Sequence, residues 1–106
     1  MWKRAFKRIP TNIKVRFFSG IKEFYGTITN LSEKGMFIRT KVSFPLQPEL
    51  RILIPMKADI LRIRALVKSF GISDNIYSGV GVELSSPSQK YLEFVGGLRT
   101  VEKSLK

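Results

Sequence analysis

The segment Leu61–Lys68, with the sequence LRIRALVK, decides the fold class because apolar residues fill every second position. Successive side chains of a strand point to opposite sides, so this pattern predicts a β-strand with one buried face and one face in water. The face expected in water carries Arg62, Arg64 and Lys68. These basic residues could bind phosphate groups, although a solvated face is the simpler interpretation.

Similar strand-like segments precede and follow this one, separated by turn-forming Gly, Pro, Ser, Asp and Asn residues. They are Asn12–Phe18, Glu23–Thr29, Gly35–Thr40, Glu49–Pro55 and Ile76–Leu84. Closing a small sheet on itself removes its exposed edges and encloses an apolar interior. The sequence therefore predicts an all-β domain, a small six-stranded antiparallel β-barrel followed by a C-terminal helix.

The helix is predicted from a change of pattern after Ser85. Ser86-Pro87-Ser88-Gln89 is typical of a capping box with proline at the first helical position, which places the N-cap at Ser86. The apolar residues that follow recur at steps of three and four and form one stripe, expected to cover the barrel: Tyr91, Phe94, Val95, Leu98, Val101 and Leu105. Gly96-Gly97 predicts a bend or fraying within this helix.

Length and charge limit the organisation of the chain. Its 106 residues are of the usual size for one domain, 1–106, with a flexible basic segment at 1–11, a barrel at 12–84 and a helix at 86–105. The 19 Lys and Arg residues against 8 Asp and Glu give a net charge of +11. Such an excess favours anionic partners, namely nucleotides, nucleic acids or lipid headgroups.

Composition also excludes several classes of chemistry. With no Cys and no His, the chain has no disulfide, thiol nucleophile or imidazole base, and no zinc site of the usual kinds. We expect no metal and no catalytic residues, so an enzyme is the least favoured class. No apolar run is long enough for a transmembrane helix, and no signal peptide is apparent, so we expect a cytoplasmic protein without membrane insertion.

Two short motifs carry the functional information. Arg4 and Arg8 form an R-x-x-x-R pattern, and Asn30, Ser32 and Gly35 form an N-x-S-x-x-G pattern at the end of a predicted strand. From composition, the first pattern is expected roughly 0.6 times by chance in such a chain, and an [N/D]-x-S-x-x-G only about 0.04 times. The second motif therefore carries most of the specificity.

The residue types in both motifs suit an anionic ligand that contains guanine. An arginine fork can donate to the O6 and N7 edge of guanine, stack on a base or pair with phosphate. Asn30 can both donate and accept, Ser32 adds a hydroxyl, and Gly35 permits a positive φ or a close backbone approach. Taken alone, the first motif could be a solvated basic tail and the second a plain turn.

In this order, the two motifs resemble the signature of the PilZ domain, a bacterial receptor module for the second messenger cyclic di-GMP. The resemblance covers nearly the whole chain, because the family also combines a basic N-terminal segment, a small antiparallel barrel and a closing helix. It implies that Arg4, Arg8, Asn30, Ser32 and Gly35 bind cyclic di-GMP, with Lys3 as an additional candidate. No other cofactor is implied.

The resemblance also implies a non-enzymatic receptor or adaptor, which signals to an unknown downstream protein when the ligand orders residues 1–10. Two alternatives remain. One is a basic barrel that binds single-stranded nucleic acid through stacking aromatics, for which the candidates are Phe17, Phe18, Phe24, Tyr25 and Phe37. The other is a PilZ-like interaction domain that binds no nucleotide.

Overall fold

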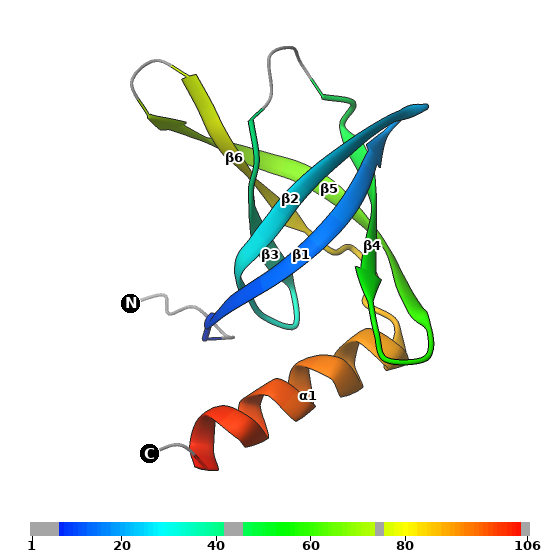
Figure 1. Ribbon diagram of the computed structural model, residues 1–106, viewed down its shortest axis with the longest axis vertical. Helices are drawn as coiled ribbons and strands as arrows, with labels where there is room; N and C mark the ends of the chain where they lie inside the picture. The colour runs from blue at the N-terminus through cyan, green and yellow to red at the C-terminus, as the bar shows by residue number, and fades with distance from the viewer. Residues whose placement is uncertain (1–6, 42–45, 74–75, 105–106) are drawn as a thin grey trace.

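The computed structural model describes residues 7–41, 46–73 and 76–104 (Figure 1). Its elements are six strands and one helix: β1 (Ile9–Ser19), β2 (Lys22–Leu31), β3 (Gly35–Arg39), β4 (Glu49–Pro55), β5 (Ile60–Ser73), β6 (Ile76–Glu83) and α1 (Gln89–Ser104). The alternation of buried and exposed side chains is clearest along β4 and β5, as the sequence pattern predicts.

The six strands close into one barrel with the order β1-β2-β3-β6-β5-β4. Every neighbouring pair is antiparallel, and β1 closes the barrel by pairing with β4 through Arg16, Phe17 and Phe18. The predicted six-stranded antiparallel barrel with a C-terminal helix is confirmed. Residues 9–11, which the sequence pattern places in the basic N-terminal segment, form the start of β1.

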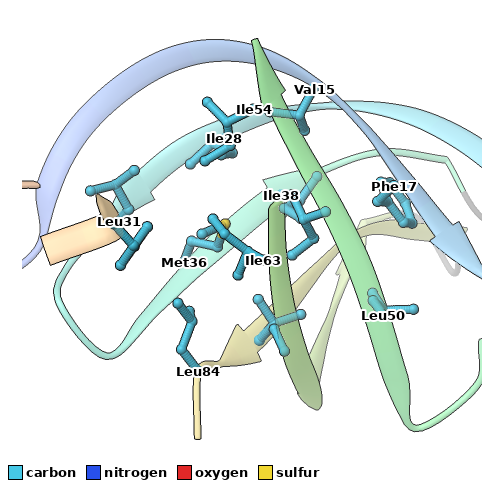
Figure 2. Packing of buried hydrophobic residues seen from close by; sticks show 14 of the residues in the cluster. Val15, Phe17, Ile28, Leu31, Met36, Ile38, Leu50, Ile54, Ile63 and Leu84 are labelled. Carbon is cyan, nitrogen blue, oxygen red and sulfur yellow. The ribbon is translucent and has the colours of Figure 1, made fainter. Parts of the chain in front are cut away.

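The barrel interior is filled by aliphatic side chains and one phenylalanine. Buried residues come from all six strands, and Figure 2 shows Ile28, Met36 and Ile63 among the side chains that point into this common space. Each such side chain contributes roughly 1.5–3 kcal/mol to folding when it leaves water. Phe17 lies here with its ring stacked on that of Phe24, at 5.3 Å between centroids. These two rings therefore belong to the core and are not platforms for nucleic-acid bases.

Helix α1 lies at the end of the barrel where the β2–β3 turn also lies (Figure 1). It begins at Gln89, and the Ser88 hydroxyl accepts a hydrogen bond from the backbone N–H of Tyr91 at 3.1 Å. The predicted cap at Ser86 is wrong, because Ser88 holds the N-cap position. The helix continues through Gly96 and Gly97, so the fraying predicted as one possibility there is not observed.

Four of the six residues of the apolar stripe on α1 pack on the barrel. Tyr91 and Val95 are fully buried, and Phe94 and Leu98 pack against the core. Val101 is 57% exposed, which corrects the expectation that the whole stripe covers the barrel. The part of the chain that the structure describes contains no helix long and apolar enough to cross a bilayer.

Candidate functional site

Arg8 of the first sequence motif meets the second motif at the N-terminal end of β1. Arg8 directly precedes this strand, and the β1–β2 register pairs Pro10 with Asn30. The Arg8 Nη1 donates a hydrogen bond of 2.9 Å to the Asn30 Oδ1. The other terminal nitrogen of Arg8 lies 3.6 Å from the position that a Cβ on Gly35 would occupy. Three of the predicted site residues, which are up to 27 positions apart (35 − 8), are thus brought together.

Gly35 is required here by space and not by backbone conformation. A Cβ at this position would stand 2.5 Å from the carbonyl oxygen of Val82 on β6. Among the glycines of the described chain, only Gly20 has a positive φ, 62°. The close approach proposed for Gly35 is confirmed, while the positive φ is wrong.

Ser32 shapes the turn between β2 and β3. Its side chain is buried, and its hydroxyl oxygen accepts a hydrogen bond of 3.2 Å from the backbone N–H of Lys34. Its own N–H donates to the Gly35 carbonyl at 2.8 Å. These are the bonds of a plain serine turn. They fix the path of the chain from Asn30, before the turn, to Gly35, after it.

An open depression of about 500 Å³ adjoins the Arg8–Asn30 pair on the outer surface of the barrel. It is lined by Arg8, Pro10, Thr29, Asn30, Phe37, Ser69 and Gly81. The Phe37 ring lies against Gly71 and Gly79, where added Cβ atoms would meet it at 2.8 Å and 2.5 Å. The depression therefore combines a guanidinium, a carboxamide, two hydroxyls and an aromatic side chain.

Phe37 belongs to neither sequence motif and is predicted only as a stacking residue for nucleic acid, although the strand pattern indicates that it points outward. Met36 and Ile38 are fully buried, so Phe37, between them on β3, must point to the outside of the barrel. An outward aromatic ring two positions after the motif glycine is close enough to reach the same ligand. Thr29 and Ser69 had no comparable signal.

A second cluster of hydrogen-bonded residues, which neither sequence motif contains, adjoins the β2–β3 turn. Arg99 of α1 donates through Nε and Nη2 to the two carboxylate oxygens of Glu33, at 2.8 Å and 2.6 Å. The same Nη2 also donates to the Lys7 carbonyl oxygen at 2.6 Å. Hydrogen bonds from Arg99 hold the pKa of Glu33 below its ordinary value. One side chain thus joins the N-terminal segment, the β2–β3 turn and α1.

The helix is also tied to the turn by Tyr91. Its hydroxyl donates a hydrogen bond of 2.7 Å to the Ser32 carbonyl oxygen in a fully buried position. Burial raises the pKa of Tyr91, with a further increase from the negative charge of Glu33. The phenol therefore stays neutral and remains a donor throughout the physiological pH range.

The remaining candidates, Lys3 and Arg4, lie outside the described residues. Within residues 7–41, 46–73 and 76–104, no group of three His, Cys, Asp or Glu side chains is placed to hold a metal ion. The groups around the depression are donors, acceptors and one ring, which suit recognition of an anionic heterocyclic ligand.

Comparisons with known proteins agree with this architecture. A family model described as PilZ domain matches residues 3–95. No curated protein matches the chain. Among solved structures, it is similar to the Bacillus subtilis inhibitor of motility, MotI/DgrA, with a TM-score of 0.75 and 16% identity, over 99% of this chain and 52% of that one.

Two further structures are similar and contain c-di-GMP, that is, cyclic di-GMP. The PilZ domain of YcgR from Escherichia coli has a TM-score of 0.73 and 14% identity, over 98% of this chain and 95% of that one. PlzA from Borreliella burgdorferi has a TM-score of 0.66 and 14% identity, over 94% of this chain and 52% of that one. The chain thus spans about half the length of MotI/DgrA and of PlzA. At these identities the likeness establishes the barrel fold.

Proposed function

This chain belongs to the PilZ domain family, and on that basis we propose that it is a receptor for cyclic di-GMP without catalytic activity. The observation that carries the proposal is the 2.9 Å hydrogen bond from Arg8 to Asn30. It joins one residue of the arginine motif to one residue of the turn motif, and both line the same depression, which supports a shared ligand site. The ligand-bound relatives, YcgR and PlzA, give the ligand its identity.

The proposed contacts follow from the chemistry of each side chain. The Arg8 guanidinium donates to a phosphate or to the O6 and N7 edge of guanine, and the Asn30 amide pairs with another edge of the base. The Phe37 ring offers a face or edge for packing against a purine. Arg4 and Ser32 complete the set by their places in the family motifs, and Gly35 keeps the approach to Arg8 open.

The proposed signal is the ordering by the ligand of the part of residues 1–10 that precedes β1, since Ile9 and Pro10 already belong to this strand. Arg8 lies within this segment, and the carbonyl of Lys7 beside it accepts a hydrogen bond from Arg99 on α1. A ligand that binds Arg8 would therefore act on a segment already in contact with the helix and, through Glu33, with the turn. A downstream protein could recognise the resulting surface.

Calorimetric titration with cyclic di-GMP tests the proposal. We expect Arg8→Ala, Arg4→Ala and Asn30→Ala each to weaken binding by about tenfold or more, because each removes charged or multiple hydrogen bonds to the ligand. The control is Arg62→Ala, which removes an exposed arginine from a strand face outside the depression and should bind like the wild type.

Thermal unfolding of each variant separates loss of the site from loss of the fold. Titrations with GMP and with a DNA oligomer test the alternative of a nucleic-acid-binding barrel, for which binding would fall steeply with salt and show little preference for guanine. Unchanged affinity in both arginine variants would remove the proposed mechanism. A wild-type protein that binds none of these ligands would instead be an interaction domain.

A further inference from the structure

Three arginines gather on the outer face of β4 and β5. Arg51 is the direct cross-strand partner of Arg64, and Arg62 is the partner of Leu53 in the adjacent row. All three arginines are exposed. Like charges directly opposite each other destabilise an antiparallel pair. The fold keeps this unfavourable arrangement, which indicates a use for the charge.

The charges on this face are not neutralised by the protein itself. Within the described residues, neither Arg62 nor Arg64 forms an ion pair. Asp59 exerts some attraction on Arg62, but its carboxylate is paired with Lys90. Arg51 donates to the Gly20 carbonyl at 3.0 Å, and its guanidinium lies 5.3 Å from the centre of the Phe18 ring. These contacts hold Arg51 in place and leave its positive charge available.

The arginines line a groove of about 800 Å³ between this face and residues 84–88, which lead into α1. Leu53 lines this groove and also a smaller adjoining hollow of about 160 Å³, which Tyr25 and Ile60 line as well. Tyr25 is 68% exposed. Arginine and tyrosine around an apolar centre are the residues enriched where proteins bind one another.

This groove is separate from the nucleotide site proposed above. The two hollows share no lining residue. Strand β5 contributes to both hollows but through different residues, Arg62 and Arg64 to the groove and Ser69 to the depression, while β4 lines only the groove of the two. A partner on one face and a small ligand on the other can therefore bind at the same time.

We propose that this groove binds an acidic segment of a partner protein, with carboxylates on Arg51, Arg62 and Arg64 and an apolar side chain on Leu53. Arginine pairs with carboxylates through two parallel hydrogen bonds, which a spaced series of Asp and Glu residues can supply. Glu49 lines the groove beside the arginines, whereas the carboxylate of Glu23, beyond Phe18, is paired with Arg16 at 3.0 Å. The Glu49 carboxylate repels a continuous phosphate backbone, whereas a short peptide can place its acidic residues on the three arginines and a neutral residue beside Glu49.

Fluorescence polarisation with a short labelled peptide of Glu, Asp and Leu tests the assignment. The double variant Arg62→Glu with Arg64→Glu should weaken peptide binding by about tenfold or more, because carboxylates would then face carboxylates. Lys41→Glu with Lys57→Glu changes the net charge equally at exposed positions outside the groove and should bind within about twofold of the wild type. Both pairs replace exposed residues, and thermal unfolding checks that each variant is folded.

Amide chemical-shift mapping on the wild type locates the peptide independently. Shifts at Arg51, Leu53 and Arg64 support the assignment, and shifts centred on Asn30 and Phe37 overturn it. Equal weakening by both double variants would mean attraction by net charge alone, which also overturns it. Tighter binding of a matched oligothymidylate in the same groove would assign the surface to nucleic acid instead. Peptide binding that persists with saturating cyclic di-GMP, or in Arg8→Ala, separates this proposal from that for the nucleotide site.

Discussion

The backbone of Gly35 lies so close to β6 that a β-carbon would stand 2.5 Å from the Val82 carbonyl oxygen. Gly97 is the opposite case, since an added Cβ in the middle of α1 would meet nothing within 4 Å. One glycine is therefore fixed by the backbone of a neighbouring strand. The other has no steric reason to be glycine within the described structure.

Alanine at these two positions should change stability in opposite directions. Gly35→Ala should lower the free energy of unfolding by about 1–3 kcal/mol, because β3 and β6 must separate to admit the methyl group. Gly97→Ala should raise it by about 1 kcal/mol, because alanine favours the helix interior. Denaturant unfolding of both variants measures the two values, and a Gly35→Ala protein as stable as the wild type would contradict the close approach.

Helix α1 is attached to the barrel at the β2–β3 turn, next to the candidate site. The Tyr91 hydroxyl reaches the Ser32 carbonyl, which belongs to the turn that orients Asn30 and Gly35. Tyr91 and Val95 are fully buried while Val101 is exposed, so the attachment is concentrated near the turn. The helix therefore supports the candidate site in addition to covering the end of the barrel.

Removing the Tyr91 hydroxyl should loosen this attachment. In Tyr91→Phe the ring still fills its place, but the buried Ser32 carbonyl loses its donor, which costs about 1–3 kcal/mol. Tyr25→Phe removes a hydroxyl from a residue that is 68% exposed and should leave the melting temperature nearly unchanged. Melting curves of the two variants provide the comparison, and equal effects would argue against a special role for the Tyr91–Ser32 bond.

Much of this element structure could be predicted from local sequence patterns. Apolar residues alternate along Leu61–Lys68 because one face of this strand packs in the core. The apolar stripe that contains Tyr91 and Val95 arises because the helix packs on the same core. The sequence pattern places the start of α1 too early, because Ser86 and Ser88 are both suitable N-cap residues. Only the observed hydrogen bond from the Tyr91 N–H to the Ser88 hydroxyl distinguishes them. Local patterns fix the type of an element better than its ends.

The candidate site could be predicted only in part. Arg8, Asn30 and Gly35 belong to recognisable motifs, and the structure brings them together. Arg99 had no such signal, because it is 66 positions from Glu33 and one more cation in a basic chain. Its pairing depends on where the helix docks, which no spacing within the sequence encodes.

At the scale of the whole molecule, the Arg99–Glu33 pair joins three parts of the chain that are distant in sequence. Arg99 and Glu33 retain only 25% and 22% of their side-chain exposure, and Arg99 also binds the Lys7 carbonyl. Such a shielded pair with two hydrogen bonds to one carboxylate is stronger than a typical surface ion pair. Its strength should depend on the ionisation of Glu33.

Acid should therefore weaken the fold through Glu33. Because the folded-state pKa of Glu33 lies below its ordinary value of 4.5, the stabilisation is complete above that value and is lost as the pH falls through the folded-state pKa. Between about pH 6 and about pH 3, the wild type should lose about 1 kcal/mol more stability than Glu33→Gln.

Denaturant unfolding at several pH values measures this difference, with Arg99→Gln as the matched variant. Removing the arginine should abolish the same pH-dependent contribution, and the double variant should add little to either single change. A Glu33→Gln protein that follows the wild-type pH dependence would show that the pair does not couple ionisation to folding.

The contact between Arg99 and Lys7 has an evolutionary consequence, because its acceptor is a main-chain oxygen. Any amino acid at position 7 presents the same carbonyl, so that position is free to diverge among homologues. Positions 33 and 99 meet through their side chains and should change together, with a loss of charge at one matched by a loss at the other. In an alignment of close homologues, the link between the helix and the N-terminal segment should appear as covariation of positions 33 and 99. The residue at position 7 should vary independently.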